Sequence, residues 1–205
     1  MIPEIWPLDL KTLFVGSVVT RISDTLGFYH LHPRDRFWEL LELGAITPKR
    51  VLTKPESKAL ADGHRDGSLS DPIRQIFIEK KTSQLLKLGI GITDLNRRMV
   101  AEDEKDKSGR PTSDDLHEFV DKVEKSPPRL LGFVIHPDLF VGVFKARYPS
   151  VTSTLGPQPF TIGQSEVWLL GSTTAALRGE ALTQQEDAFV ALGERMESFS
   201  TGAPP

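Results

Sequence analysis

Near-continuous apolar runs recur along the chain and give the first structural signal. Residues 12–16, 129–135 and 166–171 predict buried strands, and 89–95 predicts a strand or turn against the core. Strands that are apolar throughout and separated by helical segments are typical of a mostly parallel sheet covered on both faces. The pattern therefore predicts an α/β fold, a three-layer α-β-α sandwich with a mostly parallel central sheet.

Apolar residues at helical spacing, together with end signals, predict the helices. One helix is expected over 34–44, with Gly44 as the stop, and a second from Asp71 towards Gly89. A third is expected to begin at a cap at Thr112 or Ser113. The last is expected to begin at a Thr183-x-x-Glu186 capping box and to bury Phe189, Val190 and Met196. The Gly, Ser and Asp content of 62–72 predicts a loop, and the charges of 101–111 predict a solvated connection.

Functional residues of a parallel sheet gather in the loops at the carboxyl ends of its strands. Here these are the loop after 12–16, the "HPDLF" segment after 129–135, and "GSTTAALR" after 166–171. The first is dense in chemistry, because "HPRDRFW" at 32–38 brings imidazole, carboxylate and guanidinium groups together.

Length and composition limit the class of protein. The chain has 205 residues, of which 39% are hydrophobic and 26% charged, with a net charge of −3 and no cysteine. One domain over 1–200 with a flexible tail at 201–205 is expected, as a monomer without disulfides or thiolate chemistry. No apolar run approaches the roughly 18 residues of a membrane span, and the N-terminus lacks the order of a signal peptide. We therefore expect a cytoplasmic location and no membrane partner.

Several enzyme classes are excluded by missing motifs. The sequence has no Gly-x-x-x-x-Gly-Lys phosphate loop, no Gly-x-Gly-x-x-Gly fingerprint and no His-Glu-x-x-His pair. Its five histidines are scattered, so no metal and no cofactor are expected.

The stretch from Leu13 to Trp38 resembles the first motif region of the uracil-DNA glycosylase superfamily, and is most similar to its mismatch-specific uracil/thymine-DNA glycosylase branch. The likeness rests on Gly16 after an apolar strand and on the 32–38 run at the family's spacing. "GIGITDLNRR" (89–98) and "VWLLGSTTAALR" (167–178) are similar to later segments of the family. The resemblance implies that family's fold, DNA as the partner (a duplex with a flipped base, or a single strand), and hydrolysis of the bond between base and sugar.

The sequence departs from the family at the residue that carries its chemistry. The family's catalytic asparagine falls on Val18, which can neither position water nor carry charge. Base release needs a group that steadies the charge developing on the sugar and orients water. Asp35 is the first candidate, with a helix N-cap as its alternative role. Asp24 is the second, with a solvated turn residue as the alternative.

The resemblance also suggests where base and DNA would bind. His30 falls where the family stacks an aromatic ring on the flipped base, and an imidazole can also donate to a leaving base; a half-exposed loop histidine is the alternative. Base-binding residues are expected at Gly16, Ser17, Val18, Thr20, Phe28 and Ser172.

DNA contacts are expected in the flanking loops, with the hydroxyls of 172–174 at a helix N-terminus suited to phosphate. The alternatives are a structural cap for that loop and a solvated face for the arginines. The residues expected to contact DNA are His32, Arg34, Arg97, Thr173, Thr174 and Arg178.

These residues together predict a monofunctional DNA glycosylase that flips out and excises a damaged or modified base, leaving an abasic site. Valine at position 18 makes ordinary uracil a poor fit and favours a modified base, such as a bulky modified pyrimidine of phage DNA, which would make the protein a defence enzyme. The alternative is a catalytically silent protein of the same fold that binds modified or damaged DNA, and Val18 is its main argument.

Overall fold

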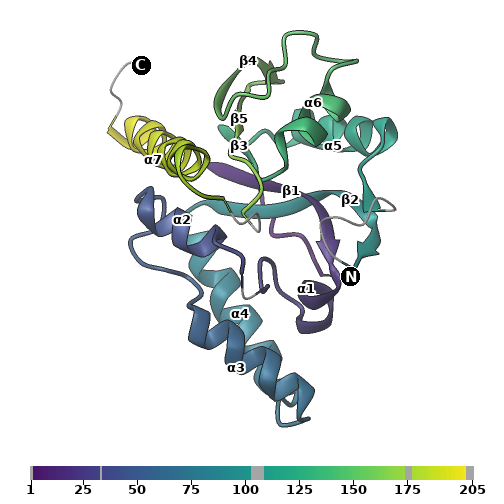
Figure 1. Cartoon of the computed structure of the whole chain (residues 1–205), viewed down its shortest axis with the longest axis vertical. Coiled ribbons are helices and arrows are strands. Elements are labelled where there is room, and N and C mark those ends of the chain that lie inside the picture. Colours follow the sequence, from purple (N-terminus) through teal and green to yellow (C-terminus); the bar gives the residue numbers. More distant parts are fainter. Residues whose placement is uncertain (1, 33, 103–108, 174–176, 202–205) are drawn as a thin grey trace.

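A five-stranded sheet forms the centre of the molecule (Figure 1). The computed structural model describes residues 2–32, 34–102, 109–173 and 177–201. The sheet order is β2-β1-β3-β5-β4, and its neighbours are parallel except for the antiparallel pair β4 and β5. The strands are β1 (Thr12–Thr20), β2 (Ile90–Ala101), β3 (Leu130–Phe133), β4 (Gly156–Ile162) and β5 (Ser165–Leu169).

Helices cover both faces of the sheet, which confirms the predicted three-layer α-β-α sandwich. Side chains alternate between the two faces along β1, so Phe14 joins one apolar cluster while Leu13 and Val15 join the other. The first cluster is completed by α1 (Arg21–Leu26), α2 (Phe37–Leu43), α3 (Lys54–Arg65), α4 (Asp71–Lys87) and α7 (Glu180–Thr201), and the second by α5 (Ser113–Lys125) and α6 (Pro137–Phe144).

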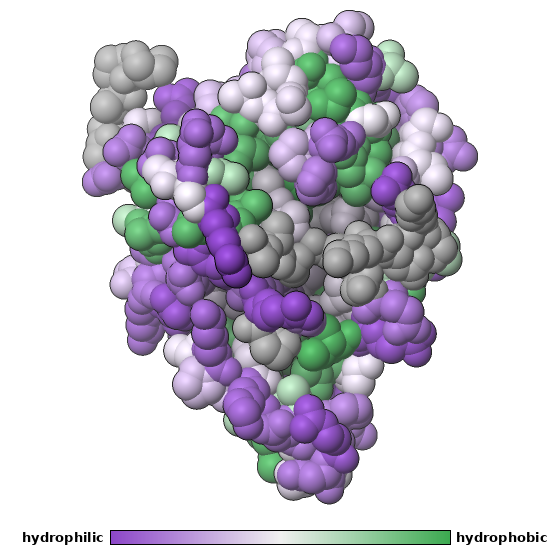
Figure 2. Space-filling model, viewed as in Figure 1, coloured by the Kyte–Doolittle hydropathy of each residue, from purple (hydrophilic) through white to green (hydrophobic). Residues whose placement is uncertain are grey.

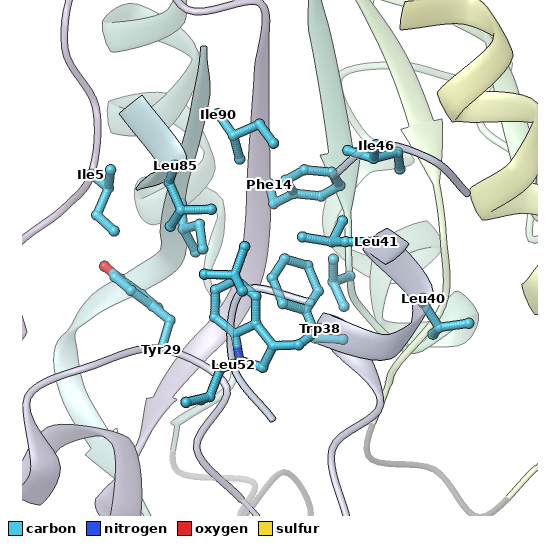
Figure 3. Close-up of a cluster of buried hydrophobic side chains, with 14 of the residues drawn as sticks. Ile5, Phe14, Tyr29, Trp38, Leu40, Leu41, Ile46, Leu52, Leu85 and Ile90 are labelled. Carbon is cyan, nitrogen blue, oxygen red and sulfur yellow. The ribbon is translucent and has the colours of Figure 1, made fainter. Parts of the chain in front are cut away.

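The first cluster anchors the segment in which the sequence concentrates its chemistry. Phe14, Trp38, Leu41 and Leu85 are each 3% exposed or less and lie in one group (Figure 3). Burying a side chain of this size contributes about 1.5–3 kcal/mol. Trp38 and Leu41 therefore hold α2, and the loop that leads into it, against the sheet.

β1 is longer than predicted. It continues past Gly16 to Thr20 because β2 runs beside it as far as Ala101, with one irregularity in register between Val18 and Val19. β-Branched residues at these positions suit an extended backbone. The residues expected to form a loop after the strand are thus part of the strand, and their backbone is fixed by the sheet.

Two segments predicted as loops contain helix. The region 62–72 begins inside α3, which starts at a capping box between Thr53 and Glu56 and continues to Arg65. The "HPDLF" segment opens α6, with His136 as its N-cap. β4 was not predicted, because its two prolines argue against a strand; an edge strand tolerates them.

The starts of two helices also differ from prediction. α2 begins at Phe37 rather than at residue 34. α7 begins at Glu180, so Thr183 is not its cap: the Thr183 hydroxyl donates to the carbonyl of Gly179, and Glu186 forms an ion pair with Arg36 at 2.7 Å.

The buried face of α7 is rotated from the one predicted. Phe189 and Leu192 are fully buried, and Met196 packs against the first cluster. Val190, however, is 37% exposed. The prediction for α7 was therefore right for Phe189 and wrong for Val190, and Met196 is partly buried.

The pair α3 and α4 extends away from the sheet (Figure 1), and hydrophilic residues cover most of its surface in the view of Figure 2. None of the helices in the described part of the chain has the length and apolar character needed to cross a bilayer.

Helix capping gives a direct test of these assignments. Thr112 accepts from the backbone N–H of Asp115 at the start of α5, as predicted, whereas Thr183 lies inside α7. We expect Thr112→Ala to lower the free energy of unfolding by about 1 kcal/mol. Thr183→Ala is the matched control and should change it by less than about 0.5 kcal/mol. Urea unfolding measures both; equal losses would contradict the observed start of α7.

Candidate functional site

A pocket opens at the carboxyl end of β1, with about 460 Å³ of empty space including the solvent at its mouth. Its wall combines the last residues of β1, the loop that precedes α2, and the adjoining strand β2. This is the edge at which functional loops of a parallel sheet were expected. The lining residues are Ile2, Gly16, Ser17, Val18, Val19, Thr20, Ser23, Tyr29, His30, His32, Asp35, Asp94 and Val134.

In this wall, the Asp35 carboxylate accepts from three hydrogen-bond donors. Its Oδ1 accepts from the Thr173 hydroxyl at 2.6 Å and from the Phe37 backbone N–H at 2.9 Å. Its Oδ2 lies 2.8 Å from Nδ1 of His30, and the side chain is only 4% exposed. One carboxylate thus joins the loop before α2, the first residue of α2, and the segment after β5.

These contacts keep Asp35 ionised at neutral pH. Burial by itself would raise the pKa of Asp35, but the adjacent His30 ring and the three hydrogen bonds outweigh it and hold the pKa below its ordinary value. An ionised carboxylate can only accept hydrogen bonds, so Nδ1 of His30 carries a hydrogen. Nε2 is then the nitrogen of His30 that can exchange a proton with a ligand.

His30 is held in an unusual backbone conformation. Its φ is 53°, in the left-handed region that costs a non-glycine residue about 1–3 kcal/mol. Trp38 Nε1 donates to the His30 carbonyl at 3.1 Å, and the imidazole stacks on Phe37 with centroids 3.9 Å apart. One face of the ring is therefore already covered, which leaves less room for stacking on a flipped base than the sequence suggested.

The contacts of Asp35 bear on both roles considered for it, that of a helix cap and that of a catalytic group. The bond to the Phe37 N–H satisfies a donor at the start of α2, as a cap would. The bond to His30 is one that capping does not require. Catalysis by Asp35 stays a prediction. In this geometry the carboxylate would act through His30, by orienting its imidazole.

The predicted base-binding residues are only partly brought together. Gly16, Ser17, Val18 and Thr20 line the pocket. Phe28 does not: it is 2% exposed and stacks on Trp38 in the core.

Two further predicted residues also lie away from this wall. Ser172 lines a separate cavity beside His136 and Leu155, because the chain turns at Gly171. Asp24 lies in the first turn of α1 and does not line the pocket.

The predicted DNA contacts also divide into two groups. Arg34 and Arg178 are exposed, and His32 lines the pocket. Arg97 already pairs with Glu4 at 3.1 Å and donates to the Ile2 carbonyl, so it is held within the protein.

Ser172 and Thr173, the described part of the "STT" segment, do not open a helix as expected. α7 begins only at Glu180, and Thr174 lies outside the described residues. Thr173 is 1% exposed and donates to Asp35, which makes it a support of the pocket rather than a phosphate ligand.

Sequence reasoning missed three polar residues of the pocket, Ser23, Tyr29 and Asp94. Asp94 lies beside Gly16 in the pairing of β1 with β2, and a Cβ at Gly16 would clash with its Oδ1. The phenol of Tyr29 is buried, and its hydroxyl has no hydrogen-bond partner among the described residues. An acidic residue inside the apolar 89–95 run was the available signal for Asp94.

No protein-family model matches the chain. Within the described ranges, no group of three or more His, Cys, Asp and Glu side chains could hold a metal ion.

Replacing Thr173 tests the Asp35 network. Thr173→Val removes a hydrogen bond to a buried charge, and we expect it to lower the free energy of unfolding by about 1.5–3 kcal/mol at neutral pH. Thr47→Val is the matched control, because the Thr47 hydroxyl is equally buried and has no partner in the described part of the chain; this change should be neutral or stabilising.

The pH dependence of this difference has a definite sign. The folded pKa of Asp35 is lowered, so its stabilisation is present above the unfolded value of about 3.9 and is lost as pH falls through the folded pKa. The deficit of Thr173→Val relative to wild type should therefore shrink in acid. Urea unfolding over a pH series measures it, and a deficit that grows in acid would contradict the ionised network.

Proposed function

We propose that the chain is a monofunctional DNA glycosylase that hydrolyses the bond between deoxyribose and a flipped, damaged or modified base. The observation that carries the proposal is the hydrogen-bonded pair of the buried Asp35 carboxylate and the partly buried His30 ring, in the wall of a pocket at the carboxyl end of β1. The resemblance of residues 13–38 to the uracil-DNA glycosylase superfamily supports the choice of DNA as substrate.

His30 is the proposed catalytic base in this reaction. Its Nε2 takes a proton from water while the water oxygen forms a bond to the anomeric carbon. The bond from that carbon to the base nitrogen breaks, and its electron pair leaves with the base. The proton on His30 then passes to the departing base.

Asp35 is a positioning residue in this scheme. The Phe37 N–H and the Thr173 hydroxyl hold its carboxylate in place. Its bond to Nδ1 of His30 fixes the tautomer of that ring and stabilises the imidazolium that forms during the reaction. This differs from the sequence-based hypothesis, in which Asp35 itself handled the water and His30 only the base.

The alternative, a silent protein that binds modified or damaged DNA, keeps one specific argument. Val18 lines the pocket at the position where the family has its catalytic asparagine, and it offers no polar group there. A measurement of base release decides between the two.

Single-turnover base release from a panel of DNA duplexes and single strands tests the proposal. The panel carries uracil, thymine, cytosine and C5-substituted pyrimidines, and alkaline cleavage reveals abasic sites. We expect Asp35→Asn to lower the rate by at least about 100-fold, because the amide favours the wrong tautomer of His30. DNA affinity should be unchanged, and the rise of the wild-type rate with pH should disappear in His30→Gln.

His117→Gln is the matched control, since His117 is exposed on α5, away from the pocket, and its replacement should leave the rate unchanged. Wild-type rates in Asp35→Asn would exclude the pair from the chemistry. Binding without base release from any member of the panel would favour the silent alternative.

A further inference from the structure

Asp94 and Tyr29 bring two polar groups to the same pocket as His30. Asp94 is 7% exposed and Tyr29 4%, so both are shielded from bulk solvent. Neither takes part in the chemistry proposed for Asp35 and His30. Their placement bears instead on which base the pocket accepts.

The Asp94 carboxylate lies over Gly16, in the space that a side chain at position 16 would fill. Glycine is thus needed there for the carboxylate to reach the end of β1. A carboxylate has about four lone-pair sites, so Asp94 can accept a hydrogen bond from a ligand in addition to its contacts within the protein.

The Tyr29 hydroxyl complements this acceptor. The ring borders the apolar cluster with its hydroxyl end turned away from Trp38 (Figure 3), and no described residue bonds to it. Burial, with the charge of Asp94 next in importance, raises the pKa of Tyr29, so the phenol keeps its proton and can donate. An unpaired buried hydroxyl is unfavourable, and a ligand that accepts from it removes this penalty.

The remaining wall is mixed: Ile2, Val18, Val19 and Val134 are apolar, and Ser17, Thr20, Ser23 and His32 are polar. Buried polar groups such as Asp94 and Tyr29 discriminate strongly, because a ligand that mismatches them leaves them unpaired.

We infer that Asp94 and Tyr29 select a base that presents an exocyclic amino group beside an unprotonated ring nitrogen, as cytosine and adenine do. The amino group donates to Asp94, and the ring nitrogen accepts from the Tyr29 hydroxyl. Uracil and thymine place a carbonyl oxygen where the amino group would be, and two acceptors then face each other. The inference rests on the proposed function, because it assigns the pocket to a base.

Binding of free bases tests this independently of chemistry. Isothermal titration of the whole chain with cytosine, adenine, uracil and thymine should show the amino bases binding at least about tenfold more tightly than the oxo bases. The comparison of cytosine with adenine shows whether the pocket takes a pyrimidine or a purine. No binding of either amino base at millimolar concentration would overturn the inference.

Two variants separate the roles of the two side chains. Asp94→Asn keeps the shape but can donate as well as accept, so the preference for amino bases should fall at least about tenfold. Tyr29→Phe should weaken binding of the amino bases more than that of the oxo bases, because only an unprotonated ring nitrogen accepts from the phenol. Asp121→Asn, an exposed carboxylate on α5, is the control and should change nothing.

The outcomes distinguish this inference from the proposed function. Equal binding of cytosine and uracil, or an unchanged ratio in Asp94→Asn, would overturn the inference even if wild type releases a base from DNA. A clear preference for amino bases in a protein that releases no base would support the inference and overturn the proposed activity. If Asp94→Asn fails to fold, Tyr29→Phe decides, and undiminished cytosine binding by that variant would overturn the inference.

Discussion

The buried carboxylate of Asp35 is the interaction on which the arrangement of the pocket depends. Its three hydrogen bonds come from His30, from the first residue of α2 and from Thr173 after β5; the first two are close to Asp35 in the sequence, and Thr173 is 138 residues away. The backbone bond from Arg36 to the Thr173 carbonyl, at 3.0 Å, ties the same segments. Without a charge at this point, His30 would lose both its orientation and the compensation for its left-handed backbone.

In the proposed function, the pocket separates two tasks, proton transfer and base recognition. The pair of His30 and Asp35 offers a base of defined tautomer, while Asp94 and the Tyr29 hydroxyl offer an acceptor and a donor for recognition. The Val18 side chain has no donor, acceptor or base, so neighbouring polar groups must carry the chemistry in the proposed function. Such a redistribution is physically reasonable, because a reacting group needs a particular position in space rather than a particular position in the chain.

The layers of the fold could be predicted from the sequence, because three of the five strands are short continuous apolar runs. The start of α5 could also be predicted, because its cap is formed by residues that are adjacent in the sequence. β4 could not, since its prolines are tolerated only at an edge that the sequence does not reveal. The same contrast holds for the residues of the site. Asp35 and His30 could be identified from the sequence, because they belong to one local cluster of polar residues. Asp94 matters because it pairs with Gly16, and Thr173 because it reaches Asp35, and both relations depend on strand register and tertiary contact.

The protonation of the His30 ring is the most direct test of this account. Long-range ¹⁵N–¹H correlation spectra of labelled protein, recorded at about pH 8 where an ordinary imidazole is neutral, distinguish the two tautomers. The account predicts a hydrogen on Nδ1 and a lone pair on Nε2 of His30, because the ionised Asp35 carboxylate 2.8 Å away can only accept. A spectrum with the hydrogen on Nε2 would contradict it.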